Sequence, residues 1–161
     1  MGARPSGRGI PANVVGGFAY ASLGDTEPAT WDRMLSMNAT SAFLCCRAAV
    51  PGMRAGKWGR IVNVASVPAV GGGAANLTAY SAAKAAVLNL TYSLAKELMA
   101  DGITANAIVP STIDTPANRA AMPDADRSTW LSAEAIGDVV VMLASEQAGI
   151  VTGTAVNLAK A

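Results

Sequence analysis

The most chemically informative residues are Tyr80 and Lys84, which lie four positions apart in Tyr80-Ser81-Ala82-Ala83-Lys84. On a helix, positions i and i+4 share one face, so this spacing places a phenol beside an ammonium group. A free phenol has a pKa of about 10, and a nearby positive charge favours the phenolate. The pair therefore predicts a tyrosine that exchanges protons. The alternative is a solvated lysine beside a half-buried tyrosine. The neighbouring segments favour the tyrosine that exchanges protons.

Other polar residues follow two strand-like runs elsewhere in the chain. Residues 60–66 contain a short buried strand that ends at the hydroxyl of Ser66, and a glycine-bearing loop separates this serine from Tyr80. Residues 103–109 form a second strand-like run, which ends in Pro110-Ser111-Thr112-Ile113-Asp114-Thr115-Pro116. Upstream, Asn38 lies within a long apolar segment of helical character. The chain thus presents, in order, an amide, a hydroxyl, a Tyr-x-x-x-Lys pair and a threonine-containing loop.

This ordered set resembles the active-site signature of the short-chain dehydrogenase/reductase family: an Asn on a helix, a Ser after a strand, Tyr-x-x-x-Lys and a Pro-Gly loop with a Thr. The resemblance implies that Tyr80 acts as the general acid/base and that Lys84 lowers its pKa and holds the nicotinamide ribose. It also implies that Ser66 hydrogen-bonds the substrate oxygen and that Asn38 holds a relay water. No histidine is needed for this chemistry, and the chain has none.

The implied reaction is hydride transfer between an NAD(P) cofactor and a carbonyl or imine carbon, with a proton delivered to the neighbouring heteroatom. No metal is implied. The segment Asn13-Val14-Val15-Gly16 is similar to the family's Asn-Asn-Ala-Gly segment, with two valines as departures, and Ser111 stands where most members have Gly. The cofactor contacts that the resemblance implies come from Tyr80, Lys84, Asn13, Gly16, Pro110, Thr112, Ile113 and Thr115.

Within the family, residues 111–119 and 122–126 with Trp130 look most like dihydropteridine reductase and its bacterial relatives, and Gly16-Gly17-Phe18 fits the same group. This resemblance implies a pterin-like or carbonyl substrate. Residues 115–130 have the position of the family's substrate-covering segment. Its apolar residues either line a pocket or are exposed in a mobile segment; they are Met122, Pro123 and Trp130.

The elements that must position these residues alternate between strand and helix. We expect a strand near Asn13, a helix at about 30–55, a strand at 61–64, a helix at about 78–100 that stops at Asp101-Gly102, and a strand at 103–109. A polar excursion at 111–132, a helix at about 133–145 and a strand at about 154–158 follow. This order predicts an α/β fold: a truncated, Rossmann-like, doubly wound parallel sheet of about three to four strands with flanking helices.

The beginning of the chain lacks the strand, glycine-rich turn and helix with which a nicotinamide-binding enzyme of this type should open. Residues 1–12 are instead predicted as a flexible arm, and residues 13–161 as a partial short-chain dehydrogenase domain. Gly7-Arg8-Gly9 is the alternative phosphate-binding segment, but no strand precedes it and Pro11 follows closely. We therefore expect the C-terminal, catalytic part of such an enzyme, without the half that binds adenosine and pyrophosphate.

Composition narrows the functional classes further. A net charge of +1 gives no sign of nucleic-acid binding. No apolar run reaches the roughly 18 residues of a membrane span, so a cytoplasmic protein is expected. Charged residues make up only 14% of the chain, below the roughly 25% of an ordinary soluble domain, which indicates an oligomer or an uncovered apolar face. Cys45 and Cys46 suit neither a disulfide nor a metal site, and reduced packing residues are favoured over a redox role.

The two long predicted helices carry apolar residues almost all round, so they should be buried on more than one side. In the family that the chain resembles, these helices pair with those of a second subunit in a four-helix interface; the alternative is that they only cover the sheet. The first functional hypothesis is an NAD(P)-dependent oxidoreductase. The second is a non-catalytic interaction module that pairs with itself or with a full-length relative, and a third is a non-functional chain that aggregates through its unpaired strand.

Overall fold

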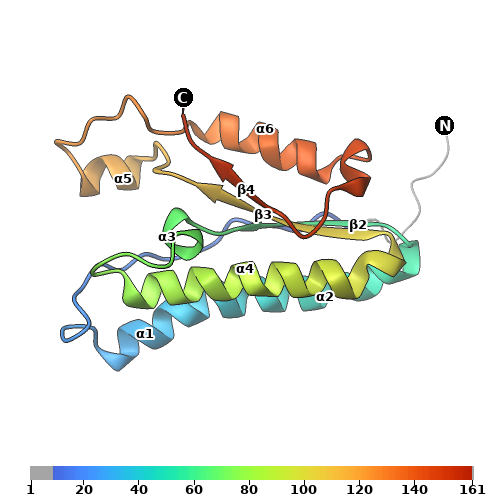
Figure 1. The fold of residues 1–161 in the computed structure, drawn as a ribbon, viewed down its shortest axis with the longest axis horizontal. Coiled ribbons are helices and arrows are strands. Elements are labelled where there is room, and N and C mark those ends of the chain that lie inside the picture. The colour runs from blue at the N-terminus through green and yellow to red at the C-terminus, as the bar shows by residue number, and fades with distance from the viewer. Residues whose placement is uncertain (1–8, 161) are drawn as a thin grey trace.

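The computed structural model describes residues 9–160, and its centre is a parallel sheet of four strands in the order β1-β2-β3-β4 (Figure 1). These strands are β1 (Ala12–Asn13), β2 (Gly59–Val64), β3 (Ile103–Pro110) and β4 (Ala155–Leu158). Every neighbouring pair is parallel. The predicted positions of all four strands are therefore confirmed to within two residues at each end, and so is the parallel sheet.

Helices cover both faces of the sheet. On one face lie α1 (Pro28–Met34), α2 (Ser41–Gly56) and α4 (Thr78–Leu98), and on the other lies α6 (Ala133–Ala144) (Figure 1). Successive residues of β2 point to opposite faces. Ile61 packs with Met53 and Leu98 on the side of α2 and α4, whereas Val62 packs with Ile136 and Leu143 on the side of α6. Burial on both faces explains why β2 and β3 read as nearly continuous apolar runs.

The predicted single helix at 30–55 is wrong in one respect, because a π-helical turn, Leu35–Thr40, separates α1 from α2. Two short helices were also absent from the prediction, α3 (Val67–Val70) and α5 (Pro116–Ala121). Each follows a residue in extended backbone conformation, Ser66 or Thr115, and has proline in its first turn. Both are too short to show a 3.6-residue apolar period, so the sequence carries no helical pattern at these positions.

The predicted flexible arm must be corrected where the structure describes it. Residues 1–8, including Gly7-Arg8, lie outside the described residues. Gly9 forms an isolated parallel bridge with Gly59, and its carbonyl accepts a hydrogen bond from Arg60 N at 3.2 Å. The carbonyl of Pro11 accepts from Val62 N at 3.1 Å, and Ala12 belongs to β1. Residues 9–12 are ordered along β2 because the amides of this buried strand need acceptors.

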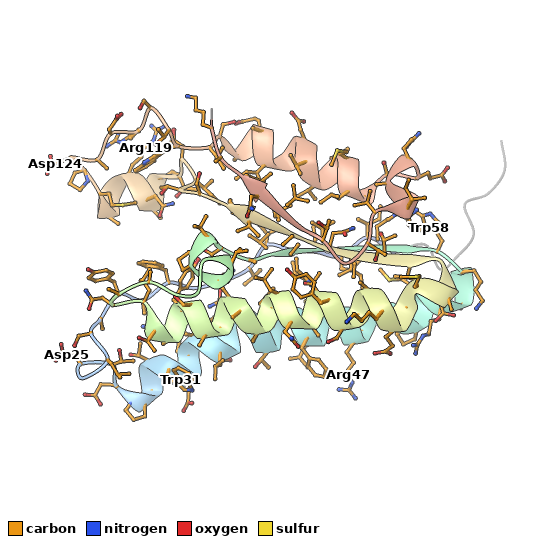
Figure 2. The ribbon with its side chains drawn as sticks, viewed as in Figure 1. Asp25, Trp31, Arg47, Trp58, Arg119 and Asp124 are labelled. Atoms are coloured by element: carbon orange, nitrogen blue, oxygen red, sulfur yellow. The ribbon has the colours of Figure 1, made fainter. Side chains whose placement is uncertain are left out.

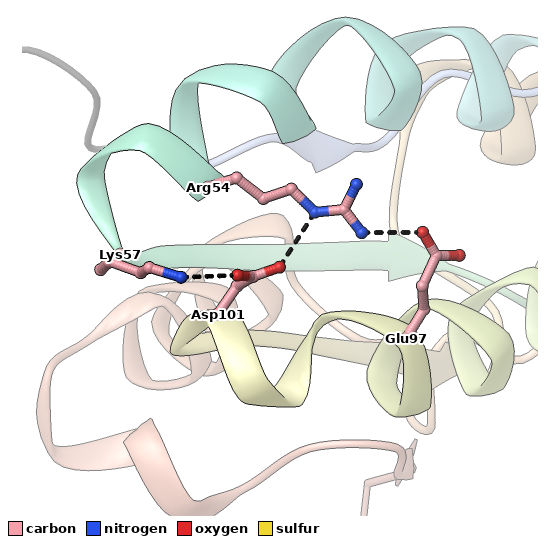
Figure 3. A network of polar contacts seen from close by, with 4 residues as sticks. All are labelled: Arg54, Lys57, Glu97 and Asp101. Carbon is pink, nitrogen blue, oxygen red and sulfur yellow. Dashed lines mark hydrogen bonds and ion pairs between the residues drawn. The ribbon is translucent and has the colours of Figure 1, made fainter.

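At the amino end of the sheet, charged side chains join the last turns of α2 and α4 (Figure 3). Arg54 contacts Glu97 at 3.0 Å and Asp101 at 2.9 Å, and Lys57 contacts Asp101 at 2.9 Å. Lys57 and Arg54 lower the pKa of the Asp101 carboxyl. This network lies on the surface at the end of the molecule opposite to the candidate site.

The outer faces of the first two long helices are exposed in this single chain, and their pairing with a second subunit stays a prediction. Val87 and Leu98 of α4 are in the core, but Trp31, Phe43 and Leu44 of α1 and α2 keep 38%, 48% and 50% of their surface exposed. Figure 2 shows Trp31 and Arg47 pointing away from the sheet. In the part of the chain between residues 9 and 160, no helix has the length and apolar character needed to cross a membrane.

Candidate active site

The predicted catalytic side chains meet at the carboxyl end of the sheet. Ser66 follows β2 and begins α3, while Tyr80 and Lys84 lie in the first turns of α4. Figure 1 shows α3, the start of α4, α5 and the loop before α1 gathered at this same end of the molecule. Ligands of open parallel sheets bind at this edge, because the loops that follow the strands converge there.

Tyr80 is half-buried, and its phenol interacts with the hydroxyl of Ser66. Burial raises the pKa of Tyr80, and the hydrogen bond with Ser66 opposes this rise without cancelling it. The expectation that Lys84 lowers the pKa of Tyr80 is therefore not met in this structure. The Nζ of Lys84 lies 6.0 Å from the centroid of the Tyr80 ring, and desolvation of the phenol dominates. The phenol stays protonated at neutral pH.

Lys84 is buried, with only 5% of its surface exposed. Its Nζ donates a hydrogen bond of 2.8 Å to the carbonyl of Val64, the last residue of β2. Burial lowers the pKa of Lys84 from 10.5 to about 8, because an ammonium group is poorly solvated there. The lysine thus gains or loses its proton near neutral pH and sits one helical turn from Tyr80.

Asn38 lies in the π-helical turn and is almost completely buried. Its Nδ2 donates to the carbonyls of Met34 at 2.9 Å and Gly17 at 3.1 Å, and its Oδ1 accepts from the amide of Gly17 at 3.3 Å. Isolated π turns inside helices are frequent at functional sites. The two amide hydrogens of this side chain are thus directed at two backbone carbonyls, those of Met34 and Gly17, and the relay-water role stays a prediction.

Gly16 fits into the site because it has no side chain. A Cβ at this position would lie 2.5 Å from Asn38 Oδ1 and 3.2 Å from Lys84 Nζ. Asn13, the other predicted cofactor contact of this segment, has its Nδ2 directed inward, 2.7 Å from Asn63 Oδ1 and 3.3 Å from the sulfur of Cys46. The structure therefore brings Gly16 to Lys84 and turns the side chain of Asn13 toward the core.

The loop after β3 is closed at its base by backbone pairing. Leu131 N donates to the carbonyl of Thr112 at 2.9 Å, and Ile113 bridges with Leu131. The hydroxyl of Thr115 accepts from the amide of Asn118 at 3.1 Å and caps α5. Pro110 is buried at the end of β3. Pro110 thus ends the strand, and Thr112, Ile113 and Thr115 follow it at the base of the excursion.

Within the excursion itself, Trp130 is buried with 7% of its surface exposed, whereas Met122 keeps 39% exposed. Arg119 makes a two-pronged ion pair with Asp114, with distances of 2.6 and 2.8 Å. Figure 2 shows Arg119 and Asp124 at the same end of the molecule as Asp25. Trp130 is therefore not exposed as one of the two alternatives required, and its place in a substrate pocket stays a prediction.

Two residues next to the site were not identified from the sequence. The ring of Phe18 lies against the Tyr80 ring, with centroids 5.0 Å apart and planes at 68°. Asn63 is fully buried beneath the site, accepts from Asn13 and donates to Thr91 Oγ1 at 2.8 Å. Successive residues of β2 point to opposite faces of the sheet, and this alternation places Asn63 on a buried face. A polar residue within a buried strand is the signal in the sequence that could have identified it. No spacing rule connects Phe18 with Tyr80.

Known proteins are similar to this chain in sequence and in fold. A family model described as enoyl-(acyl carrier protein) reductase matches residues 10–158. The dehydrogenase/reductase SDR family member 6 of Danio rerio is 36% identical over 158 residues, covering 89% of this chain and 64% of that protein. The 3-oxoacyl-(acyl-carrier-protein) reductase of Pseudomonas aeruginosa is 38% identical over 135 residues, covering 78% of this chain and 54% of that protein.

A solved structure, acetoin dehydrogenase from Enterobacter cloacae, matches with a TM-score of 0.82 and 29% identity over 92% of this chain and 62% of that chain. The chain thus spans less than two thirds of the length of these relatives. The family match nevertheless covers nearly all of its residues, and the parallel sheet with helices on both faces agrees with the solved relative. The chain belongs to the short-chain dehydrogenase/reductase family.

Proposed function

We propose that the chain is the catalytic part of an NAD(P)-dependent oxidoreductase that transfers hydride to or from a carbonyl carbon. The observation that carries this proposal is the cluster at the carboxyl end of β2: the Tyr80 phenol interacts with the Ser66 hydroxyl, and the buried Lys84 lies one turn further along α4. A hydroxyl pair of this kind holds a carbonyl oxygen by hydrogen bonds, and a phenol in the pair supplies its proton.

In the direction of reduction, Ser66 and Tyr80 both donate hydrogen bonds to the substrate oxygen. Tyr80 then transfers its proton to this oxygen as negative charge develops there. Burial keeps the phenol protonated at neutral pH, because it raises the pKa of Tyr80, so the residue is ready to act as an acid. Lys84, whose pKa is lowered to about 8, is the neighbouring group that exchanges protons in this pH range.

The residues at this end of the sheet fit the nicotinamide end of the cofactor, which supplies the hydride when bound. Because Gly16 has no side chain, its backbone approaches Lys84 closely: a Cβ there would lie 3.2 Å from Lys84 Nζ. Tyr80 and Lys84 would hold the ribose, and Gly16, the backbone of Asn13 and residues 110–115 would make the other contacts with the cofactor. The relatives include a 3-oxoacyl-(acyl-carrier-protein) reductase and an acetoin dehydrogenase, which supports a carbonyl substrate; a pterin-like substrate remains the alternative.

The test begins with a titration of NADH and NADPH into the purified chain, followed by nicotinamide fluorescence. Saturable binding supports the proposal, and no binding into the millimolar range contradicts it for this chain alone. Reduction of 2,3-butanedione by NADPH or NADH is then measured. We expect Tyr80→Phe to lower kcat by about 100-fold or more, whereas Tyr92→Phe on the same helix should not change it. Equal rates in wild type and Tyr80→Phe would contradict the mechanism.

A second candidate function is a non-catalytic interaction module that pairs through its long helices with a second copy or with a full-length relative. The exposed side chains of Phe43 and Leu44 on α2 favour it, since large apolar residues grouped on one helix are expected at protein interfaces. Sedimentation of the wild-type chain and of a Phe43→Glu variant tests this function. A dimer that dissociates in the variant supports it, and a monomer at every concentration that does not pair with a full-length relative contradicts it.

A further inference from the structure

Phe18 lies against the ring of Tyr80 but is not covered by this contact. The ring centroids are 5.0 Å apart and the planes meet at 68°, which is an edge-to-face arrangement. Phe18 nevertheless keeps 62% of its surface exposed. Part of an aromatic ring beside the proposed general acid is therefore open to a ligand.

Hydrogen bonds on both sides hold the segment that carries Phe18. Before it, the backbone of Gly17 exchanges two hydrogen bonds with the side chain of Asn38, at 3.3 and 3.1 Å. After it, the amide of Ala21 donates to the carbonyl of Asn76 at 2.9 Å. One anchor is on the π-helical turn and the other is on the loop that leads to α4. Phe18 is thus a positioned side chain, and its ring has a defined place beside Tyr80.

The two chain segments around Tyr80 carry no charge. Residues 14–24 and residues 65–83 contain no Asp, Glu, Lys or Arg. The nearest charged side chain in sequence, Lys84, is buried and donates to the backbone of Val64. A ligand group that lies between these segments meets no charged side chain from either of them. An uncharged, apolar group is the chemistry that such surroundings accept, because a charged group would lose its hydration without a partner.

We propose that Phe18 determines substrate specificity by stacking on a flat aromatic substituent of an uncharged ketone or aldehyde whose carbonyl is held at Tyr80 and Ser66. This inference rests on the proposed function for the position of the carbonyl. A planar ring packs closely on the exposed part of the Phe18 ring, whereas a puckered aliphatic ring of similar size makes fewer contacts with it.

The test compares acetophenone with cyclohexyl methyl ketone, two uncharged ketones of similar size of which only the first has a planar ring. Binding to the full chain is followed by saturation-transfer NMR, so that the readout does not need turnover. We expect the wild-type chain to bind acetophenone about three- to tenfold more tightly than the cyclohexyl ketone. In Phe18→Ala, the two affinities should come within about twofold of each other.

Two further variants keep the test independent of folding defects. Phe18→Leu retains an apolar side chain, so it should bind both ketones and lose the preference for the planar one. Leu23→Ala changes another exposed residue of the same segment, with 73% of its surface exposed, and should keep the wild-type preference. A wild-type chain that binds both ketones equally or neither of them, or a preference that survives Phe18→Ala, would overturn the inference.

Failure of the proposed function gives a different pattern. Tyr80→Phe removes the proton donor and leaves Phe18 in place, so the preference for acetophenone should persist while reduction is lost. If the wild-type chain shows the Phe18-dependent preference but reduces no ketone with NADH or NADPH, the specificity assignment stands and the catalytic proposal fails. If it reduces both ketones with equal kcat/KM in wild type and Phe18→Ala, the specificity assignment fails and the catalytic proposal stands.

Discussion

The ammonium group of Lys84 donates a 2.8 Å hydrogen bond to the carbonyl of Val64, the last residue of β2. This bond ties the second turn of α4 to the strand that leads to Ser66. The ammonium group is directed at the peptide backbone, and its distance from the centroid of the Tyr80 ring is 6.0 Å. Lys84 therefore helps to set the position of α4 relative to β2, in addition to its proposed part in proton exchange.

The lowered pKa of Lys84 predicts a pH dependence of stability. Burial lowers this pKa from 10.5 to about 8, so between these values the unfolded chain binds more protons than the folded chain. The free energy of unfolding should therefore rise with pH in this window, by up to about 3 kcal/mol. Urea denaturation from pH 7 to just below 10 measures it; at higher pH, ionisation of Tyr80, whose folded pKa is raised, has the opposite effect.

Two variants check the assignment of this pH dependence to Lys84. Lys84→Met has no ammonium group to titrate and should show a much flatter profile over the same range. Lys96→Met, at an exposed position of the same helix, should keep the rise. A wild-type stability that does not increase between pH 8 and 10 would contradict the burial of a charged Lys84.

Gly16→Ala should destabilise the fold and disturb the site. The added methyl group would lie 2.5 Å from Asn38 Oδ1 and 3.2 Å from Lys84 Nζ, so one of these buried groups must shift. A cost of about 1–3 kcal/mol is expected from such overpacking. Gly52→Ala is the matched control, because nothing lies within 4 Å of its Cβ position in α2, and it should stabilise by about 0.5–1 kcal/mol. Chemical denaturation measures the free energy of unfolding of both variants. A Gly16→Ala variant that is more stable than Gly52→Ala would contradict the close approach of Gly16 to Asn38 and Lys84.

Asn63→Leu should loosen the first strand. Asn63 is fully buried, and its side chain links Asn13 on β1 to Thr91 on α4 at 2.7 and 2.8 Å. The variant leaves the Asn13 amide without this acceptor, which should cost about 1–3 kcal/mol. Amide hydrogen exchange should accelerate around β1 first. Asn157→Leu, at an exposed position of β4, is the control and should leave β1 protection unchanged; equal exchange in both variants would contradict the role of Asn63.

Arg54→Ala should have little effect on stability, although its side chain contacts both Glu97 and Asp101 (Figure 3). Exposed ion pairs are offset by solvation and side-chain entropy, and salt screens them. Arg60→Ala should instead cost about 2 kcal/mol or more, because Arg60 is buried and donates to the carbonyls of Gly59 and Ser145 at 2.8 and 3.0 Å. Urea denaturation at low and high salt measures the stability of both variants. A larger loss of stability in Arg54→Ala than in Arg60→Ala would contradict this prediction.

The sequence alone predicted the alternation of strands and longer helices, and it placed the candidate residues Ser66, Tyr80 and Lys84 near one another. Tyr80 and Lys84 share a helix face because of their spacing, and Ser66 and Thr112 follow strands whose carboxyl ends meet at one edge in any parallel sheet. These are consequences of local periodicity and of topology. They do not depend on how the side chains finally pack, which is why the parallel sheet with helices on both faces could be predicted.

The tertiary structure alone decided which groups touch. Burial reverses the expected direction of the pKa of Tyr80, because desolvation depends on everything that packs around the phenol. Hydrogen bonds join Asn38 to Gly17, and a ring contact joins Phe18 to Tyr80. The residues of each pair are far apart in sequence. Loop packing creates these contacts, and no local pattern of residues encodes them. The pairing of residues 9–12 with β2 arises in the same way, from the need of buried strand amides for acceptors.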